Sequence, residues 1–473
     1  MRRDVAHYTG SYRLSAKHIF SSNILYSDLF YQTPGGLTAA ELSANPKQAR
    51  PAAGAFRGAV TQQAAVYLKT LYTGISSALT LNECWKWTTG FYGSYTDFKN
   101  PTIRNYEKKY EKGIGARSVL QYKHSFFTGT VGAELQQGFF NTTVYGNIAG
   151  RQDTLQFIAD IQSRQANVFA QAGVELPKGF VLEAGLSYND FFYDYSRQNR
   201  NGNVNDESSF TPQLVPRISL LKKLPSVSLY AAVSKGYSVP SIDEVFAGND
   251  VFNKSLKAET ALNYEVGVKA TLLPGKLWLD AAFYIFRLQN TIVSRRDAGG
   301  GDFYTNAGNT KQQGAELAVH FLPVNNNTYF IRRLKFSASF TGIRARFNNY
   351  QQGTVVYDGN QVTGTPSNVL VINADMMLSN RIYVNTTFNY TDHIPLNDAN
   401  SCYALAYTLH LVKLGYKTAI GKATETHFYF ASERSARNPY SLGNDLNAAG
   451  NRFFNPAAPH IFSVGIQCRF RVR

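Results

Sequence analysis

The feature that most constrains this chain is alternation: about nineteen segments place an apolar residue at every second position. Successive side chains of a strand point to opposite faces, so one face can meet lipid while the other meets water. In the last segment, the apolar face comprises Phe462, Val464, Ile466, Cys468 and Phe470. A single segment of this kind also suits a half-buried strand of a soluble antiparallel sheet. Repetition along the whole chain predicts an all-β fold, namely a large antiparallel transmembrane β-barrel.

Two classes of connection alternate between these segments. The short connections carry turn residues or a polar pair and lie at 17–18, 82–83, 125–126, 177–179, 222–225, 274–275, 323–327, 379–380 and 421–422. The long connections are polar and lie at 33–61, 98–111, 141–151, 197–207, 237–259, 294–301, 348–357, 393–400 and 435–452. Outer-membrane barrels have short periplasmic turns and longer extracellular loops. The long connections are therefore predicted to form the extracellular mouth.

The strand directions predict that this chain is part of a longer one. The last strand runs toward a periplasmic end at Phe470, and counting back makes the first strand, 5–16, run the same way. Bacterial single-chain barrels have an even number of strands, so we expect an odd number of strands to precede Met1. The apolar stretch of about 7 to 15 residues that a secretion signal needs does not follow Met1. We therefore expect no export signal within this chain.

Composition agrees with a barrel. Hydrophobic residues make up 44% of the chain and the mean hydropathy is −0.26, and without an apolar run of about 18 residues we expect no transmembrane helix. Aromatic residues reach 14%, as expected if rings form girdles where the lipid band meets water. The length of 473 residues would suit two or three soluble domains, but no linker divides the chain. We predict one domain over 1–473, with an aromatic-rich β-sandwich as the alternative.

The residue types that catalyse reactions or bind metals are scattered. The cysteines, Cys84, Cys402 and Cys468, are too few and too far apart for a disulfide framework or a cysteine metal site. The histidines show no paired spacing of the kind found in zinc sites. The sequence also lacks a zinc-protease motif, a serine-hydrolase motif and a phosphate-binding loop. We therefore expect no enzyme activity, no metal site and no cofactor.

The net charge of +16 raises the question of nucleic-acid binding, for which a clustered basic face is the usual sign. The arginines instead fall at or near the long connections: Arg151, Arg164, Arg197, Arg200, Arg295, Arg296, Arg344, Arg346, Arg434, Arg437 and Arg452. In a barrel they would ring the mouth and concentrate an anionic ligand, whose carboxylates suit guanidinium groups. Neutralising the phosphates of outer-membrane lipid explains any single arginine equally well. As a set, they favour an acidic ligand over nucleic acid.

Several blocks of sequence resemble the barrel of TonB-dependent outer-membrane receptors in their order and spacing. They include LNYEVG and YTNAG and lie at 229–237, 240–244, 256–267, 282–284, 290–293, 304–308 and 313–317. The stretch 31–38 resembles the branch that takes up ferric siderophores, including receptors of the ferric citrate type. Stretches 441–445 and 455–457 resemble the last loop of those receptors. The resemblance covers essentially the whole chain.

The resemblance implies a barrel of about 22 strands around an N-terminal plug, whose TonB box is pulled by the inner-membrane energy-transducing complex to release ligand. With about 19 of these strands present, residues 1–473 are expected to be the C-terminal β-barrel domain, without the signal peptide, plug and first strands. The implied function is energy-dependent uptake of ferric siderophores or similar metal chelates across the cell outer membrane. The alternative is a passive porin-like or adhesin-like barrel, which would have only a signal peptide and one strand upstream.

Four side chains are predicted to contact the ligand because they are cationic or aromatic and lie on loops at the mouth: Arg295, Arg296, Tyr237 and Arg200. Most of the other residues in the family blocks are interpreted as structural. Gly308 and Gly314 are expected on a strand, where glycine marks a bend or a close approach. Glu265 and Glu316 are expected to face the lumen, where water lowers the cost of a charge.

Overall fold

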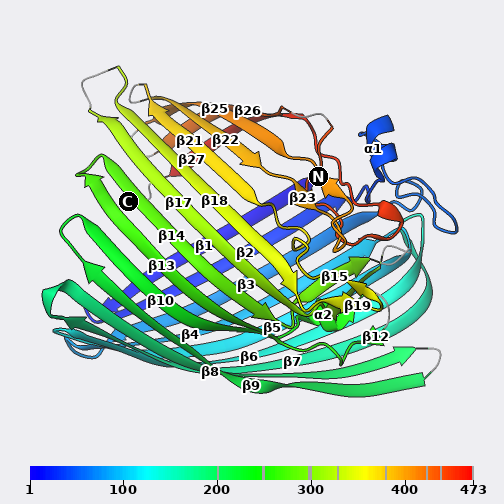
Figure 1. Ribbon diagram of the computed structural model, residues 1–473, viewed down its shortest axis with the longest axis horizontal. Coiled ribbons are helices and arrows are strands. Elements are labelled where there is room, and N and C mark those ends of the chain that lie inside the picture. The colour runs from blue at the N-terminus through cyan, green and yellow to red at the C-terminus, as the bar shows by residue number, and fades with distance from the viewer. Residues whose placement is uncertain are drawn as a thin grey trace.

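The computed structural model describes residues 1–199, 202–247, 251–296, 301–326, 330–378, 381–421, 424–436 and 439–470. Within these residues, nineteen antiparallel strands form one sheet that curls into a barrel (Figure 1). The strands of this wall are β1 (Arg2–Ser15), β2 (His18–Gln32), β3 (Ala65–Thr80), β4 (Trp85–Pro101), β5 (Asn105–His124), β6 (Phe127–Ile148), β7 (Arg151–Leu176), β8 (Phe180–Asn199), β9 (Gly202–Lys223), β10 (Val227–Ser238), β13 (Glu259–Leu273), β14 (Leu277–Gln289), β17 (Asn309–Asn325), β18 (Arg333–Asn348), β21 (Asn368–Met377), β22 (Ile382–Thr391), β25 (Tyr407–Ile420), β26 (Thr424–Ser435) and β27 (His460–Phe470). The predicted fold class and strand number are confirmed.

The topology of the wall is a simple meander. Each wall strand from β2 to β26 pairs with the wall strand before it and the one after it in the chain. The strands of the N-terminal part lie behind those of the middle part in Figure 1, so the sheet curves back on itself. Among the described residues, β1 pairs only with β2, and β27 pairs only with β26. These two strands are the edges of the sheet.

The predicted alternation is present in the wall. Val464 and Ile466 of β27 are 81% and 66% exposed. On β13, Val266 is 53% exposed, whereas Glu265 is half-buried on the opposite face and accepts a hydrogen bond from the Tyr230 hydroxyl at 2.8 Å. Large apolar side chains that face outward in this way are removed from water only by hydrocarbon. The wall is therefore built to stand in lipid, with its polar face inside.

Tyrosines on the inner face lie over glycines that stand directly opposite on the neighbouring strand. A Cβ atom on the glycine would overlap the ring in the pairs Tyr92–Gly115, Tyr230–Gly267, Tyr284–Gly314, Tyr383–Gly415 and Tyr429–Gly465. Gly314 therefore marks a close approach, as predicted. Gly308 lies in a loop, not on the predicted strand, and has a φ of 61°, where glycine is favoured. It still marks a close approach, because a Cβ atom there would overlap the Asn349 carbonyl.

Some of the predicted long loops are strands instead. The connection between β4 and β5 is only 102–104, the one between β6 and β7 is 149–150, and the one between β8 and β9 is 200–201, outside the described residues. The polar residues on either side continue the ladder, because backbone pairing does not require apolar side chains. The predictions of long loops at 98–111, 141–151 and 197–207 are therefore wrong. These hairpins are long, and β7 alone has 26 residues.

The short turns lie mostly where they were predicted. Residues Pro177–Gly179 form the turn η1, and 274–276 join β13 to β14. The predicted turn at 323–327 is wrong in its first half, because β17 continues to Asn325 after a shift of register. Turn residues 379–380 and 422 lie outside the described residues.

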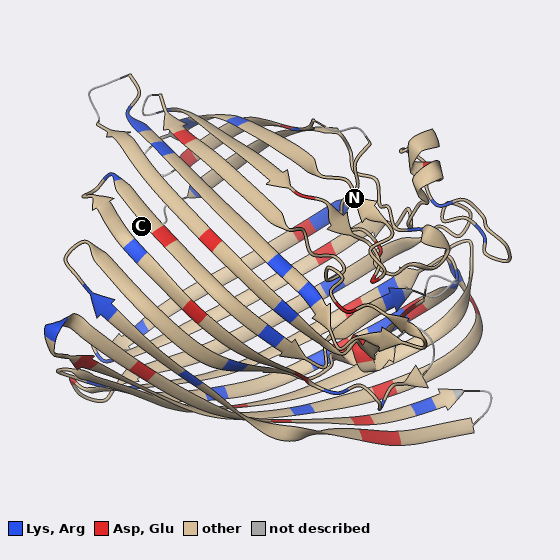
Figure 2. Ribbon diagram, viewed as in Figure 1, with Lys and Arg blue, Asp and Glu red and all other residues tan. Residues whose placement is uncertain are grey.

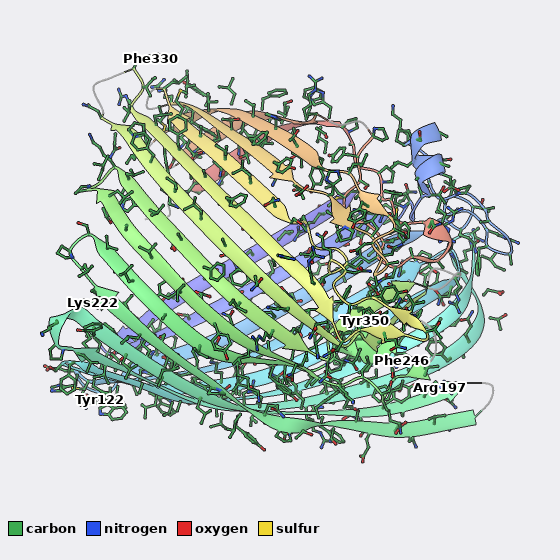
Figure 3. The ribbon with its side chains drawn as sticks, viewed as in Figure 1. Tyr122, Arg197, Lys222, Phe246, Phe330 and Tyr350 are labelled. Carbon is green, nitrogen blue, oxygen red and sulfur yellow. The ribbon has the colours of Figure 1, made fainter. Side chains whose placement is uncertain are left out.

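The remaining six connections are long and lie together at one end of the barrel (Figure 1). We call residues 33–64, 239–258, 290–308, 349–367, 392–406 and 436–459 the cap. Its short elements are α1 (Ala39–Ala44), α2 (Ile242–Val245), β11 (Phe246–Ala247), β12 (Val251–Phe252), β15 (Ile292–Arg296), β16 (Asp302–Asn306), β19 (Gln351–Gln352), β20 (Val355–Val356), β23 (Ile394–Pro395), β24 (Tyr403–Ala404) and η2 (Ala449–Asn451). Phe246 and Tyr350 mark the cap end in Figure 3, and Tyr122 and Lys222 mark the opposite end. No helix in the described part of the chain is long and apolar enough to cross a membrane.

Candidate functional site

The cap is the candidate ligand-binding region, and it contains apolar clusters of its own. In the first cluster, loop 239–258 contributes Val245, Phe246, Phe252 and Leu256, which pack against buried side chains of β6 to β9. The ring of Tyr195 on β8 stacks on Phe252 with the ring centroids 4.6 Å apart. Loop 239–258 thus folds back onto the wall strands instead of projecting from the barrel.

Polar contacts fix the same loop at its helix. Ser241 and Glu244 form a capping box at the start of α2. The Asp243 carboxylate forms an ion pair with the Lys109 ammonium of β5 at 3.0 Å. On the other side, the Tyr193 hydroxyl of β8 donates a hydrogen bond to the Pro240 carbonyl at 2.8 Å. Helix α2 is therefore held between β5 and β8, within the curve of the sheet.

The first and last loops of the cap are joined to each other. Leu37 is fully buried, and its backbone exchanges two hydrogen bonds with Phe454, at 2.8 and 3.1 Å. Arg452 binds both carboxylate oxygens of Glu41, at 2.7 and 2.9 Å. This bidentate geometry is the strongest that an arginine and a carboxylate can form. Two segments more than 400 residues apart in sequence therefore behave as one surface.

Glu41 also closes the capping box of α1 with Thr38. Partial burial alone would raise the pKa of this carboxyl, but the backbone N–H of Thr38 and the guanidinium of Arg452 outweigh it and hold the pKa below its usual range. The carboxylate is therefore charged whenever the pH is near neutral. Its contacts with Arg452 and Thr38 persist throughout that range.

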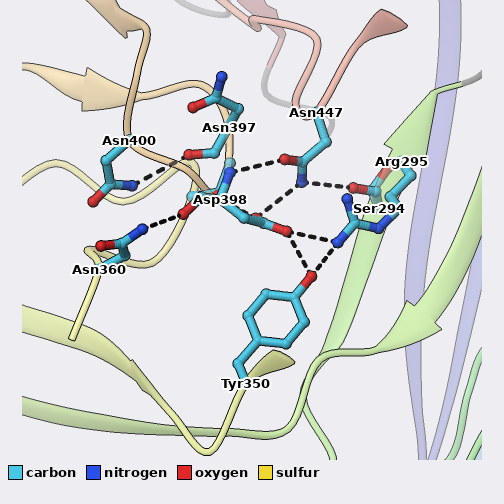
Figure 4. Close-up of polar contacts among 9 residues, drawn as sticks. Ser294, Arg295, Tyr350, Asn360, Asn397, Asp398, Asn400 and Asn447 are labelled. Atoms are coloured by element: carbon cyan, nitrogen blue, oxygen red, sulfur yellow. Dashed lines mark hydrogen bonds and ion pairs between the residues drawn. The ribbon is translucent and has the colours of Figure 1, made fainter. Parts of the chain in front are cut away.

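A second junction is centred on Asp398, which is 2% exposed (Figure 4). Its Oδ2 atom lies 2.9 Å from the Arg295 guanidinium and accepts a hydrogen bond from the Tyr350 hydroxyl at 2.8 Å. Its Oδ1 atom accepts hydrogen bonds from Thr363 at 2.6 Å and Asn447 at 3.1 Å. Burying a charge is costly unless it is paired and hydrogen-bonded, and Asp398 meets both conditions.

The partners of Asp398 come from different loops. Arg295 belongs to loop 290–308, Tyr350 and Thr363 to loop 349–367, and Asn447 to loop 436–459. Asn447 extends the network by donating a hydrogen bond to the Ser294 carbonyl at 3.0 Å. Burial and the adjacent carboxylate of Asp398 raise the pKa of Tyr350, so its hydroxyl stays protonated and donates. One carboxylate therefore joins four loops of the cap.

The four predicted contact residues lie in different settings. Arg295 is only 13% exposed in its side chain and points into the Asp398 network. Arg296 is the last residue of β15, with its side chain outside the described residues, and Arg200 lies wholly outside them. Tyr237, at the end of β10, donates a hydrogen bond to the Thr211 carbonyl at 3.3 Å, and its ring lies 6.1 Å from that of Phe191. The structure does not bring Tyr237 and Arg295 into contact, and ligand binding by any of the four stays a prediction.

The sequence stretches that carry the family resemblance largely contact one another. Stretches 290–293 and 304–308 pair as the β15–β16 hairpin, and Asn306 connects this hairpin to 256–259 through its side-chain bonds with the Lys257 backbone, at 2.8 and 3.1 Å. In the last loop, Ser441 pairs with Pro456, and the Asn455 amide donates to Asp445 at 3.2 Å. These blocks fix the positions of the loops, as their structural interpretation predicted.

Sequence reasoning missed Asp398, Tyr350, Asn447 and Glu41. Each is a common residue type in a polar loop, and its partner lies 48 to 411 residues away. No local pattern marks such a pair. Within the described residues, no three His, Cys, Asp or Glu side chains are grouped so that they could hold a metal ion.

Comparison with known proteins places this arrangement in context. The family model described as TonB dependent receptor-like, beta-barrel, matches residues 11–430. A 120-residue stretch, 25% of this chain, is 32% identical to the metal-pseudopaline receptor CntO of Pseudomonas aeruginosa (strain UCBPP-PA14). That stretch spans only 16% of the relative.

The fold is shared with solved structures at low identity. The ferric citrate transporter FecA, in its unliganded form, superposes with a TM-score of 0.76 at 14% identity, over 99% of this chain and 70% of that one. The siderophore receptor PiuA from Acinetobacter baumannii superposes with a TM-score of 0.73 at 14% identity, over 99% of this chain and 74% of that one. At such identities the superpositions establish the architecture alone.

Proposed function

This chain belongs to the TonB-dependent receptor-like β-barrel family, and from that premise we propose that it is the barrel of a receptor for energy-dependent uptake of ferric siderophores or similar metal chelates. The family consists of outer-membrane receptors and transporters. Its relatives above include a ferric citrate transporter, a siderophore receptor and a metal-pseudopaline receptor. A metal chelate is the cargo class that best accounts for these similarities.

The observation that carries this proposal is the interlocked cap. A passive pore needs an open path, whereas here loop 239–258 packs against the wall and Asp398 joins four loops of the mouth. A pre-organised cap of this kind suits capture of one ligand, because little ordering entropy remains to be lost on binding. The family match also does not favour the porin-like or adhesin-like alternative.

We further propose that this chain is the C-terminal barrel domain of a receptor whose plug contacts the TonB complex. The edges β1 and β27 support further pairing, because unpaired backbone groups are not tolerated in hydrocarbon. Additional strands from the same receptor would complete the hydrogen bonds of both edges. The receptor would then stand in the cell outer membrane, in contact with its lipid.

We propose Tyr237, Arg296 and Arg200 as direct ligand contacts. Arg295 contributes mainly by holding the loops in place, because its guanidinium is already bound by Asp398 and Tyr350. Acidic chelates suit this assignment, since guanidinium groups recognise carboxylates in bidentate geometry.

Uptake of radioactive iron tests the proposal. A strain that lacks its own receptors would express the full-length receptor containing this chain and receive a panel of ferric siderophores. We expect saturable uptake of at least one chelate, and its loss when TonB is inactivated. Uptake that persists without TonB, or equal passage of unrelated small solutes, would instead establish a passive barrel.

The contact residues are tested in the same strain. Tyr237→Ala and Arg296→Gln are expected to weaken chelate binding about tenfold each, which corresponds to about 1.4 kcal/mol. Lys47→Gln is the matched control, because Lys47 is an exposed cation of the cap that was not predicted to bind. Equal effects of Arg296→Gln and Lys47→Gln would contradict the assignment.

A further inference from the structure

A row of positive charge crosses three neighbouring strands of the wall. Arg287 of β14 stands opposite Lys311 of β17, and Lys311 stands opposite Arg346 of β18. Arg344 lies two residues from Arg346, on the same face of β18. In Figure 2, Lys and Arg bands mark these strands near their cap ends. Side chains directly opposite one another on antiparallel strands have Cβ atoms about 5 Å apart, so the cations are close neighbours.

The row points away from the lumen. Ala345 and Phe347, which alternate with Arg344 and Arg346, are each 2% exposed, and Phe347 packs in the cap cluster with Val293 and Tyr350. Because successive residues of a strand face opposite sides, Arg344 and Arg346 are on the outer surface, where both are exposed. These cations therefore cannot meet a ligand held in the lumen.

The outer face below the row is apolar. Phe283, Leu317 and Phe340 share the face of the cations and are 48%, 41% and 38% exposed. The row thus begins where the lipid-facing band ends, on the side of the cap. In a membrane this is the level of the lipid headgroups.

Among the residues that the structure describes, the cations have no charged partner. Arg346 donates a hydrogen bond to the Gly359 carbonyl, but in the described part of the chain none of the four cations forms an ion pair. The nearby acid Asp392 is occupied by Asn368 at 2.9 Å and His393 at 3.1 Å. Like charges directly opposite each other destabilise a sheet. An external anion would remove this repulsion.

A hollow of about 420 Å³ lies beside the row. Its lining includes the apolar Phe283, Ala315 and Gly342, the cations Arg344 and Arg346, and the polar side chain of Gln313. Ser367 and Asn368 border it from the neighbouring loop and strand. The lining therefore combines apolar contact, positive charge and groups that can bind hydroxyls.

We propose that Arg287, Lys311, Arg344 and Arg346 form a binding site for the phosphorylated headgroup of an outer-leaflet glycolipid. Its phosphate neutralises the cation row, its sugar lies in the hollow, and its acyl chains run along Phe283, Leu317 and Phe340. The proposal rests on the membrane location given above. It does not depend on which chelate the receptor takes up.

Lipid binding to the detergent-purified full-length receptor tests the site. The probe is a fluorescent diphosphorylated glycolipid with the lipid A structure, compared with its dephosphorylated form. The variant R287Q/K311Q/R346Q is matched by K178Q/K222Q/K223Q, which removes three cations at the opposite end of the barrel. Folding of both variants is checked by their heat-modifiable mobility in gels.

We expect at least tenfold weaker binding of the phosphorylated probe by the row variant, and less than a twofold change in the control. The dephosphorylated probe should bind the wild type about as weakly as the phosphorylated probe binds the row variant. Equal losses in the two variants would overturn the site. Displacement of the probe by millimolar inorganic phosphate would overturn its assignment to lipid. Chelate uptake is measured separately, so normal uptake without lipid binding removes this inference and leaves the receptor function standing.

Discussion

The wall and the cap of this molecule keep their apolar side chains away from water in opposite ways. In the wall, large apolar side chains such as Val464 are mostly exposed, because the membrane takes the place of a core. In the cap, Leu37 and Leu396 are fully buried, as in a soluble domain. The same chain therefore has an exposed apolar surface in the wall, which suits lipid, and a buried apolar core in the cap, which suits water.

The two regions also differ in what holds them together. Wall strands are joined by continuous ladders between neighbours in sequence. The cap depends on a few side-chain contacts between distant loops, above all Arg295 with Asp398 and Arg452 with Glu41. Loss of one contact should thus loosen the cap without opening the wall. Each of the following measurements tests this difference.

The largest effect is expected at Asp398. Asp398→Leu leaves the Arg295 guanidinium buried without its counter-charge, and should lower the free energy of cap opening by about 3–5 kcal/mol. Hydrogen exchange should accelerate in 349–367, 392–406 and 436–459 and stay unchanged in the wall strands. The double variant Arg295→Met with Asp398→Leu removes both charges and should recover much of the loss. Faster exchange throughout the wall would show that the two regions are not independent.

The next effect is expected from an arginine placed in lipid. Val266→Arg in the wall should cost about 2–4 kcal/mol of folding free energy if it lies near the bilayer midplane, measured by denaturant titration in phospholipid vesicles. Val251→Arg in the cap is the matched control, because Val251 is 54% exposed and Val266 is 53% exposed. We expect little change for Val251→Arg. Similar losses of folding free energy at both positions would contradict the assignment of the wall to lipid and of the cap to water.

A smaller effect is expected on the inner face of the wall. Gly415→Ala forces a methyl group into the ring of Tyr383 and should cost about 1–3 kcal/mol in the same titration. Gly74→Ala is the control, because its new Cβ would have its nearest neighbours at 3.6 Å. If Tyr383→Ala does not relieve the cost of Gly415→Ala, the ring contact is not its cause.

The smallest effect is expected from pH. The pKa of Glu41 is held below its usual range, so its contribution is present above the pKa of the unfolded chain and is lost as the pH falls through the lowered value. Acidification from neutral pH should therefore release 33–50 from Arg452, at a cost on the order of 1 kcal/mol. Limited proteolysis of this segment measures the release. Glu41→Gln should make cleavage nearly independent of pH, and an unchanged pH response in that variant would exclude Glu41.

The sequence predicted the wall well and the cap poorly, for a physical reason. Alternation is local, so Val266 and Glu265 already reveal two faces of a strand. Arg295 and Asp398 are 103 residues apart in the sequence, so no local sequence pattern indicates their contact. The arginines predicted to ring the mouth partly serve cohesion of the cap, because Arg295 and Arg452 are bound to acids within it.

The predicted loop lengths were wrong where a run of polar residues was interpreted as irregular structure. In 98–111 and 141–151, strands continue outside the apolar band, where both faces of a ribbon can be polar. Alternation of hydrophobicity then disappears, although the ladder does not. Sequence periodicity therefore reports the surroundings of a strand as well as its geometry.

The long hairpins extend well beyond the apolar band of the wall. At about 3.3 Å per residue, the 26 residues of β7 extend about 86 Å, or about 60 Å in height at a 45° tilt. The apolar band is about 25 Å tall, so more than half of this height lies beyond the band. Substitutions at the hairpin tips should accordingly leave the buried contacts of the cap, such as Arg295 with Asp398, unchanged.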